Sequence, residues 1–301
     1  MSEKQYDANG VSYLGWQEVE EKYRLVQLAI APVIQQALAG NDTDLIEHLV
    51  PENAHKFEKI PVWTCWFQGF DQAPEVIQMC RKRMHEVLDS EIYEIIELDA
   101  DNISEFVTFP DWLLDKVAQE KVSLTHLSDV LRMTLLYYYG GFWVDATCFF
   151  SEDILPKNPR EMDYFGIRLK GFNAPSASEG KWVSCFLYSK KGGKLPQFVM
   201  NAYYYYFLTN DELIDYFVQD YFIRIAYDLF PEVKSAIDRM PESHPIFFYF
   251  AYYKNEPYTE ELWKEISKKN PLFKMSYKYD YEEYTENGTE TMIGHLLHSF
   301  L

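Results

Sequence analysis

Apolar residues recur along this 301-residue chain with two different spacings, and the changes between them predict where helices and strands alternate. Residues 17–39 carry apolar side chains three or four positions apart and end at Gly40, which predicts an amphipathic helix. Residues 41–50 begin with helix-capping side chains and predict a second helix. We therefore predict a helical N-terminal extension over residues 1–56, followed by one large domain over residues 57–301.

The next stretch alternates short strand-like runs with longer helical ones. Residues 60–67, IPVWTCWF, are β-branched and aromatic, and residues 92–99, IYEIIELD, nearly alternate, so both runs predict strands. Residues 74–88 and 111–120 have helical periodicity, with Pro74 suited to a first helical turn. Parallel strands need crossover connections, which helices usually supply. The order of elements therefore predicts a Rossmann-like α/β fold with a mostly parallel sheet flanked by helices.

The segment THLSDVLRMTLLYYYGGFWVDAT, residues 125–147, passes from a predicted helix through two glycines into a predicted strand. Apolar residues share one stripe of that helix, whereas Asp129 and Arg132, three positions apart, share another face. Ser123 is suited to cap the start of the helix, and Gly140 to adopt the left-handed conformation that ends it. The helix therefore has an apolar side for the core and a charged side.

Residues 142–150, FWVDATCFF, predict a buried strand with Asp145 near its carboxyl end. An unpaired buried carboxylate is costly, so Asp145 needs a metal, a hydrogen-bond donor or a ligand beside it. Open α/β sheets bind ligands at the carboxyl ends of their strands, which is where Asp145 is placed. The alternative is that Asp129 and Arg132 form a surface ion pair of little energetic value and that Asp145 caps a turn. Spacing alone does not decide between these interpretations.

The second half of the chain has weaker patterns. Residues 165–169 and 182–190 are typical of strands, and residues 195–209 and 211–230 are typical of helices. Four consecutive tyrosines at positions 203–206 predict an amphipathic helix with some of these side chains exposed. The alternative is an aromatic platform for an acceptor sugar, because aromatic faces stack on sugar rings.

Composition narrows the range of partners. The chain is 48% hydrophobic and 25% charged, as is usual for a folded protein. Its formal net charge of −19 argues against a nucleic-acid backbone or an anionic membrane surface as the main partner, because both would be repelled. Isolated cysteines indicate a reducing compartment, and the polar first residues and short apolar runs predict neither a signal peptide nor a transmembrane span. We expect a cytoplasmic protein whose membrane contact is at most peripheral, at the inner face.

Three blocks of the sequence resemble, in order, one group of bacterial enzymes. SDVLRMTLLYYYGGFWVDAT is similar to the SD-x-x-R…YGG-x-(Y/W)-x-D-x-D region of the capsular-polysaccharide-synthesis and glycosyltransferase family 32 group, the sugar-binding DXD class. IPVWTCWFQGFDQAPEVIQMC with YEIIELDADN resembles the opening strand, helix and strand of that group, and HLLHSF resembles its closing H-x-x-x-S-W. The resemblance covers residues 57–150 well and the end of the chain moderately.

The resemblance implies a GT-A fold over residues 57–301 and a retaining hexosyltransferase activity. The implied donor is a nucleotide-sugar, usually a UDP-sugar, with Mn²⁺ or Mg²⁺ across its diphosphate. The implied acceptor is a saccharide or a lipid-linked oligosaccharide in bacterial capsular or surface polysaccharide synthesis. A cation suits a diphosphate on an acidic protein, because hard divalent ions take oxygen ligands and stabilise the negative charge of the departing nucleotide.

The resemblance also assigns roles to the charged segment and to the first predicted strand. Asp145 matches the first aspartate of the DXD motif, which touches the ribose, the sugar or the metal. Asp129 and Arg132 match the pair that holds the hydroxyls of the donor sugar. Trp66, or its neighbour Phe67, matches the aromatic residue that stacks on the uracil ring. Asp145, Asp129 and Arg132 are thus the implied catalytic residues.

The C-terminal block carries further implied site residues. His295 and Ser299 match positions that approach the metal and the β-phosphate, and Phe300 replaces a tryptophan over the donor. Thr147 departs from the pattern, because the second DXD aspartate, normally a direct metal ligand, is a threonine here. Three alternatives follow: the metal binds more weakly, a water bridges the gap, or Asp145 and His295 carry more of the coordination, with Thr147 still beside the donor. The alternatives are a catalytically inactive nucleotide-sugar or saccharide binding module and an acidic α/β interaction protein.

Overall fold

A computed structural model of the chain describes two short strands at its start and most of the residues that follow. The described residues are 5–6, 12–13, 15–39, 49–51, 55–171, 175–240, 242–243 and 247–301. The helix predicted over residues 41–50 lies almost entirely outside them. Among the described residues, no helix combines the length and the apolar character that a bilayer crossing requires.

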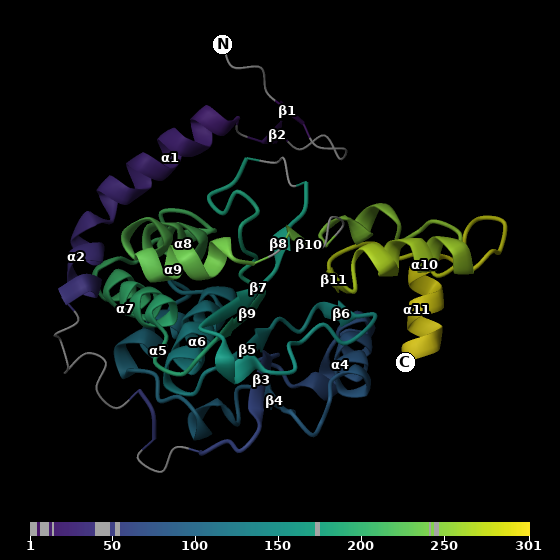
Figure 1. Ribbon diagram of the computed structural model, residues 1–301, viewed down its shortest axis with the longest axis horizontal. Helices are drawn as coiled ribbons and strands as arrows, with labels where there is room; N and C mark the ends of the chain where they lie inside the picture. The colour runs from purple at the N-terminus through teal and green to yellow at the C-terminus, as the bar shows by residue number, and fades with distance from the viewer. Residues whose placement is uncertain are drawn as a thin grey trace.

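The centre of the described structure is a five-stranded sheet with the strand order β4–β3–β5–β9–β7 (Figure 1). Its strands are β3 (Ile60–Cys65), β4 (Tyr93–Leu98), β5 (Gly141–Val144), β7 (Tyr164–Gly166) and β9 (Phe186–Ser189). β3 pairs in parallel with β4 and β5, and β9 lies antiparallel between β5 and β7. Four of these five strands therefore run in one direction, and the predicted mostly parallel α/β sheet is confirmed.

Helices flank this sheet on both faces (Figure 1). The flanking helices are α4 (Glu75–Val87), α5 (Asp111–Ala118), α6 (Leu124–Tyr138), α7 (Lys194–Thr209), α8 (Val218–Leu229) and α9 (Pro231–Asp238). Successive residues of a strand point to opposite faces of a sheet. Trp63 and Trp143 accordingly join a core that includes α6 and α7, whereas Val62 and Phe142 join a second core with α4. The alternation of side chains thus directs the residues of this sheet into two cores, one on each face.

Two N-terminal helices replace the single helix predicted over residues 17–39. α1 (Trp16–Ala29) and α2 (Ala31–Ala39) meet at Ile30. Pro32 has no backbone N–H and cannot continue the hydrogen bonding of α1, although proline is tolerated in a first helical turn. α1 packs against α8 and α2 against α7, so both helices contribute buried residues to the same core as the sheet.

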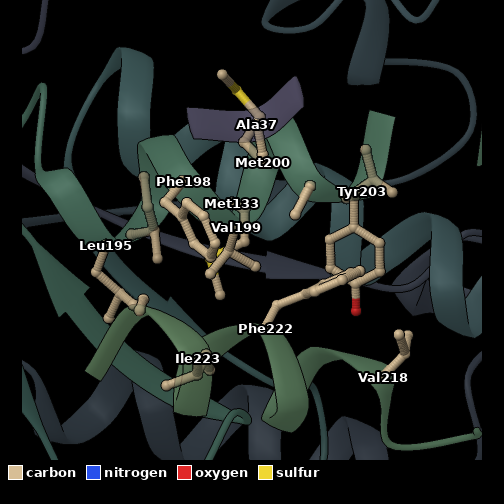
Figure 2. Close-up of a cluster of buried hydrophobic side chains, with 14 of the residues drawn as sticks. Ala37, Met133, Leu195, Phe198, Val199, Met200, Tyr203, Val218, Phe222 and Ile223 are labelled. Carbon is tan, nitrogen blue, oxygen red and sulfur yellow. The ribbon is translucent and has the colours of Figure 1, made fainter. Parts of the chain in front are cut away.

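Most of α7 is buried, including its middle turns, which corrects the prediction of exposed tyrosines at positions 203–206. Each of the four is at most 4% exposed. Figure 2 shows Tyr203 of α7 beside Phe222 of α8, and their ring centres are 5.1 Å apart. α2 and α6 cover other sides of this helix, so α7 is a core helix. The alternative of an aromatic platform at these positions is therefore wrong as well.

The chain leaves the central sheet after β5, which corrects the prediction of one continuous strand through FWVDATCFF. A turn closed by the Cys148 N–H on the Asp145 carbonyl (2.9 Å) separates β5 from β6 (Cys148–Phe150). β6 pairs antiparallel with β11 (Leu272–Lys274), which comes from the C-terminal part of the chain. Lys274 lies opposite Cys148 in this pairing. The fold thus places Lys274 next to the turn that holds Asp145.

The remaining described elements are short strands and helical turns, together with two C-terminal helices. They are β1 (Gln5–Tyr6), β2 (Ser12–Tyr13), β8 (Arg168–Leu169), β10 (Glu242–Ser243), η1 (Phe70–Gln72), η2 (Ile103–Glu105), η3 (Pro159–Glu161), η4 (Tyr249–Tyr252), α10 (Glu260–Lys269) and α11 (Met292–Phe300). The helix predicted over residues 211–230 begins only at α8. The Asp215 carboxylate accepts the Phe217 N–H (2.7 Å), a local turn that competes with helix formation.

Candidate functional site

A cleft of about 650 Å³ opens at the carboxyl ends of β3 and β5, where the sequence predicted a ligand site. Residues of α6 and α8, the segment before β9 and the segment after β11 form its other sides. Six of the residues singled out from the sequence line this cleft, namely Trp66, Phe67, Asp129, Arg132, Asp145 and Thr147. The structure therefore brings together residues that lie up to 81 positions apart in the sequence, from Trp66 to Thr147.

Asp145 accepts three side-chain hydrogen bonds at the carboxyl end of β5. It follows Trp143 by two positions, so both side chains leave the strand on the same face, and Trp143 Nε1 donates to Asp145 Oδ1 (2.7 Å). Arg132 donates to the same oxygen (3.0 Å), and Lys274 Nζ donates to Oδ2 (2.6 Å). Burial would raise the pKa of Asp145, but the charges of Lys274 and Arg132 lower it to about 2. Asp145 is therefore ionised, and the donors that its burial requires are side chains of the protein.

Arg132 is buried, which excludes the alternative of a surface ion pair with Asp129. Its side chain is 5% exposed, and Nη1 donates to Asp129 Oδ1 (2.8 Å) and to Gln219 Oε1 of α8 (2.9 Å). The guanidinium carbon lies 4.9 Å from the centre of the Trp143 ring, a cation–π contact. Burial would lower the pKa of Arg132, but the carboxylates of Asp129 and Asp145 raise it. Arg132 is thus a permanent positive charge held between α6, β5 and α8.

Lys274 is a site residue that the sequence did not predict. Its Nζ lies 2.6 Å from Asp145 Oδ2 and 2.6 Å from Thr147 Oγ1, so it bridges the two DXD-like positions. Burial would lower the pKa of Lys274, but the charge of Asp145 raises it, so the ammonium group stays charged. A single cation within the apolar run PLFKM was the local signal that could have drawn attention to it. We refer to Asp129, Arg132, Asp145 and Lys274 as the charge network.

Trp66 and Phe67 continue β3 into the wall of the cleft. The Trp66 N–H donates to the Leu98 carbonyl (2.9 Å), which extends the pairing of β3 with β4 by one residue. The Trp66 ring is half-buried and meets the Tyr277 ring edge to face, with ring centres 5.2 Å apart. Phe67 packs against the core that contains α6. One wall of the cleft is therefore aromatic, and the stacking role of either ring stays a prediction.

Exposed aromatic side chains from three separate segments line the cleft, a feature that the sequence did not predict. They are Tyr216, Phe217, Phe248, Tyr277 and Tyr279, and each is at least 41% exposed. A cluster of exposed apolar surface of this kind marks an interaction site more often than scattered exposed residues do. We refer to these five residues as the aromatic rim. No pattern within one segment could have predicted it, because the fold alone brings the three segments together.

Asp220 of α8 also lines the cleft, close to the charge network. Trp182 Nε1 donates to Asp220 Oδ1 (3.0 Å). Burial raises the pKa of Asp220 to about 6. A carboxyl group with this pKa exchanges its proton near neutral pH, as a general acid or base does. Neither residue had a sequence pattern that indicated a role.

The C-terminal residues implied by the resemblance lie on α11, at the C-terminal end of the chain (Figure 1). None of them is among the residues that line the cleft. His295 Nδ1 lies 3.1 Å from Glu290 Oε2, and its ring stacks on that of Tyr258 with centres 3.5 Å apart. Ser299 Oγ lies 3.4 Å from His295 Nε2, and Phe300 packs against side chains of α4 and β6. The structure therefore does not bring these three residues to the charge network.

Comparison with known proteins adds a family and a partial relative. The family model for capsular polysaccharide synthesis proteins matches residues 17–296, nearly the whole chain. An O-glycosyltransferase named braB, from Annulohypoxylon truncatum, is 27% identical over 125 residues, which cover 36% of this chain. The match spans only 30% of the length of that relative.

Proposed function

The chain belongs to the capsular polysaccharide synthesis protein family, and from this premise we propose that it is a retaining GT-A glycosyltransferase of the DXD class. It moves a sugar from a UDP-sugar to a saccharide in the cytoplasmic synthesis of a bacterial capsular or surface polysaccharide. The observation that carries the proposal is the buried charge network at the carboxyl ends of β3 and β5, within a cleft. The name of the partial relative supports the same class of reaction.

The donor nucleotide extends from the aromatic wall to the charge network. Its uracil ring stacks on Trp66 or Phe67, both of which line the cleft. Its diphosphate lies beside Lys274 and Arg132, whose positive charges counter the repulsion expected from a protein of net charge −19. The cleft thus offers an apolar surface for the base and cations for the phosphates.

The donor sugar lies against Asp129 and Arg132. Arg132 Nε and Gln219 Nε2 are buried and have no hydrogen-bond partner in the described part of the chain. A buried donor without a partner costs free energy, so a ligand rich in oxygen atoms is favoured here. Sugar hydroxyls supply such atoms, which supports the assignment of these residues to the donor sugar.

During transfer, the bond between the anomeric carbon and the β-phosphate oxygen breaks, and its electron pair stays on the phosphate. The acceptor hydroxyl forms the new bond to the anomeric carbon and gives up its proton. Asp145 is a weak base, because its pKa is about 2 and three donors already bind it. We therefore assign the proton to the leaving phosphate. Attack on the face from which that phosphate departs retains the anomeric configuration.

Asp220 provides a second candidate mechanism, in which the anomeric configuration of the sugar is inverted. Its pKa of about 6 suits a general base that accepts the proton of the acceptor hydroxyl. A base on the face opposite the leaving group would invert the anomeric configuration. Nuclear magnetic resonance of the anomeric proton in the first-formed product distinguishes the mechanisms, and we expect the configuration of the donor to be retained.

The acceptor approaches the anomeric carbon from the aromatic rim. Tyr216 and Phe217 precede α8, and Tyr277 and Tyr279 follow β11, on segments that line the same cleft as the charge network. Their exposed rings offer apolar faces, to which the C–H faces of a sugar can bind without loss of the polar contacts of its hydroxyls. This arrangement suits a saccharide or a lipid-linked oligosaccharide as acceptor.

A panel of UDP-, GDP- and CMP-sugars tests the proposed function. We expect one UDP-sugar to raise the melting temperature and to release UDP when a saccharide acceptor is present, as measured by scanning fluorimetry and nucleotide release. Binding without any release would identify a catalytically inactive nucleotide-sugar binding module. The absence of a shift with every nucleotide would instead support an acidic α/β interaction protein.

A further inference from the structure

The residues at the DXD-like positions do not fit a divalent metal ion. At a diphosphate, Mn²⁺ and Mg²⁺ take oxygen ligands from the phosphates, from waters and from one or two carboxylates of the protein. Position 147 offers a neutral hydroxyl, and both oxygens of Asp145 already accept hydrogen bonds from cations or from Trp143. Among the described residues, no group of three His, Cys, Asp or Glu side chains is arranged to hold a metal. The one carboxylate at these two positions is therefore already engaged by other partners.

A positive charge already lies where the ion would bind. Lys274 Nζ is 2.6 Å from Asp145 Oδ2 and 2.6 Å from Thr147 Oγ1, the two oxygens that would face a metal at this motif. An ion within about 2.1 Å of the Asp145 oxygen would lie within about 5 Å of this ammonium group, and the two would repel each other. Lys274 and a divalent ion thus exclude one another at this position.

We propose that the Lys274 ammonium group takes the place of the divalent cation and binds the diphosphate of the donor, so that transfer needs no metal ion. The inference rests on the proposed function, since it concerns the same donor in the same cleft. It also accounts for Thr147. A threonine accepts a hydrogen bond from the ammonium group without adding a second negative charge beside Asp145.

The hydrogen-bonding capacity of Lys274 supports this role. An ammonium group has three N–H donors, and Asp145 and Thr147 engage two of them. The third donor is available for a phosphate oxygen, because the Lys274 side chain is 23% exposed and lines the cleft. The charges support the same conclusion, since Asp129 and Asp145 balance Arg132 and Lys274 without any added ion. The four charges of the network are thus balanced before the donor binds, whereas hydrogen-bond donors remain for the ligand.

Lys274 acts on the departing phosphate through its charge. As the bond to the anomeric carbon breaks, its electron pair moves to the β-phosphate oxygen, and negative charge develops there. A fixed ammonium group near that oxygen stabilises the charge, as a metal does in related reactions. No proton leaves Lys274 in this step, because the adjacent carboxylate of Asp145 raises its pKa and keeps it charged.

Titration calorimetry of UDP into the full chain tests the proposal. We expect the dissociation constant to change less than about twofold between EDTA and Mn²⁺, and Mn²⁺ alone to give no binding heat. Lys274→Met keeps the aliphatic stem and removes the charge, so UDP affinity should fall about 10- to 100-fold. Lys269→Met is the matched control, because Lys269 forms an exposed pair with Glu265 on α10 and should leave UDP affinity unchanged.

A second variant keeps the test informative if Lys274→Met folds poorly. Thr147→Asp combined with Lys274→Ala restores two carboxylates and removes the competing cation, so UDP binding should become dependent on Mn²⁺. UDP binding to the wild-type chain that requires Mn²⁺ would overturn the role of Lys274 and leave the proposed function standing. Failure of UDP, GDP and CMP to bind with or without Mn²⁺ would overturn the proposed function and, with it, the role of Lys274.

Discussion

The charge network and the C-terminal cluster of acidic and histidine side chains use similar chemistry and are built in opposite ways. The C-terminal cluster consists of Glu283, Glu290, His295 and His298. Its members come from α11 and the residues just before it, and the His298 side chain is 41% exposed. The charge network instead joins α6, β5 and β11, and the Arg132 side chain is 5% exposed. The charge network therefore depends on the whole fold, and the C-terminal cluster on a short segment.

This difference in burial determines how much each ion pair contributes to the stability of the fold. Water screens exposed ion pairs, which contribute about 0 to 1 kcal/mol to stability. Removing one partner of a buried pair leaves the other charge without compensation, which destabilises a protein by about 3 to 5 kcal/mol. A buried network can also act on a ligand, because a low-dielectric surrounding strengthens its interaction with a developing charge. We therefore expect substitutions in the charge network to affect stability and turnover together.

Asp145→Asn should have the largest effect. The variant leaves Arg132 and Lys274 facing a neutral amide, so the free energy of unfolding should fall by about 2 to 4 kcal/mol, somewhat less than for a fully buried pair. Turnover should fall by at least about 100-fold, because both cations would be displaced. Urea unfolding and nucleotide release measure the two effects. Near wild-type turnover would contradict the central place of Asp145.

Asp211→Asn is the matched control for this variant. Asp211 also pairs with two lysines, Lys116 and Lys121, but its side chain is 53% exposed. We expect little or no change in the free energy of unfolding, because water screens this exposed pair. Similar losses for both aspartate variants would show that burial is not what separates the two kinds of pair.

Arg132→Lys should have the next largest effect. Lysine keeps the positive charge but cannot reach Asp129, Asp145 and Gln219 together, as the guanidinium group does. We expect calorimetry to show a loss of about tenfold or more in the affinity for the UDP-sugar and a loss of less than about threefold for free UDP. Equal losses for both ligands would indicate a structural role instead of contact with the sugar.

The features around the charge network that follow local sequence patterns were predictable from the sequence. Ser123 caps α6 by accepting the His126 N–H, and Gly140 adopts a positive φ of 75°, as the pattern indicated. A side chain at the Gly140 position would also meet the backbone of Lys191 at 2.6 Å. Asp145 directly follows a buried parallel strand, as the apolar run around it indicated, although that strand ends at Val144. These features depend on residues close together in the chain.

The parts that depend on distant segments were not predictable. Lys274 lies 129 residues from Asp145, and only the pairing of β6 with β11 brings them together. The tyrosines at positions 203–206 have a helical pattern that is compatible with either exposure or burial, and the packing of α2, α6 and α8 decides it. The break at Ile30 differs, because Pro32 was visible in the sequence and its missing N–H predicts the break.

Asp220→Asn should have a smaller effect that depends on pH. The pKa of Asp220 is about 6 in the fold, above its ordinary value, so the folded state holds a proton that the unfolded state releases. The contribution of Asp220 to the free energy of unfolding therefore decreases as the pH rises from about 4 to 6. Asparagine removes this penalty and can still accept the Trp182 N–H, so the variant should gain about 1 to 3 kcal/mol at pH 8 and little at pH 4.

Urea unfolding at several pH values checks the prediction for Asp220. A gain that is equal at pH 4 and pH 8 would show that the proton of Asp220 is not the cause. The same variant bears on the mechanism, because asparagine cannot act as a base. A loss of turnover of about 100-fold or more, together with inversion in the wild-type product, would replace the retaining mechanism with the inverting one.

His298→Ala should have the smallest effect on stability. As for Asp220, the contribution of His298 to stability should fall as the pH rises, but for a different reason. Hydrogen bonds from His298 to Glu290 and Glu283 raise the pKa of His298. The charged form therefore stabilises the fold, fully below a pH of about 6.5, and this contribution is lost as the pH rises through the raised pKa. Because the side chain is exposed, scanning calorimetry at pH 6 should show a decrease in melting temperature of about 1 °C, and at pH 9 almost none. A decrease in melting temperature at pH 6 as large as the one measured for Asp145→Asn would contradict the contrast between the charge network and the C-terminal cluster.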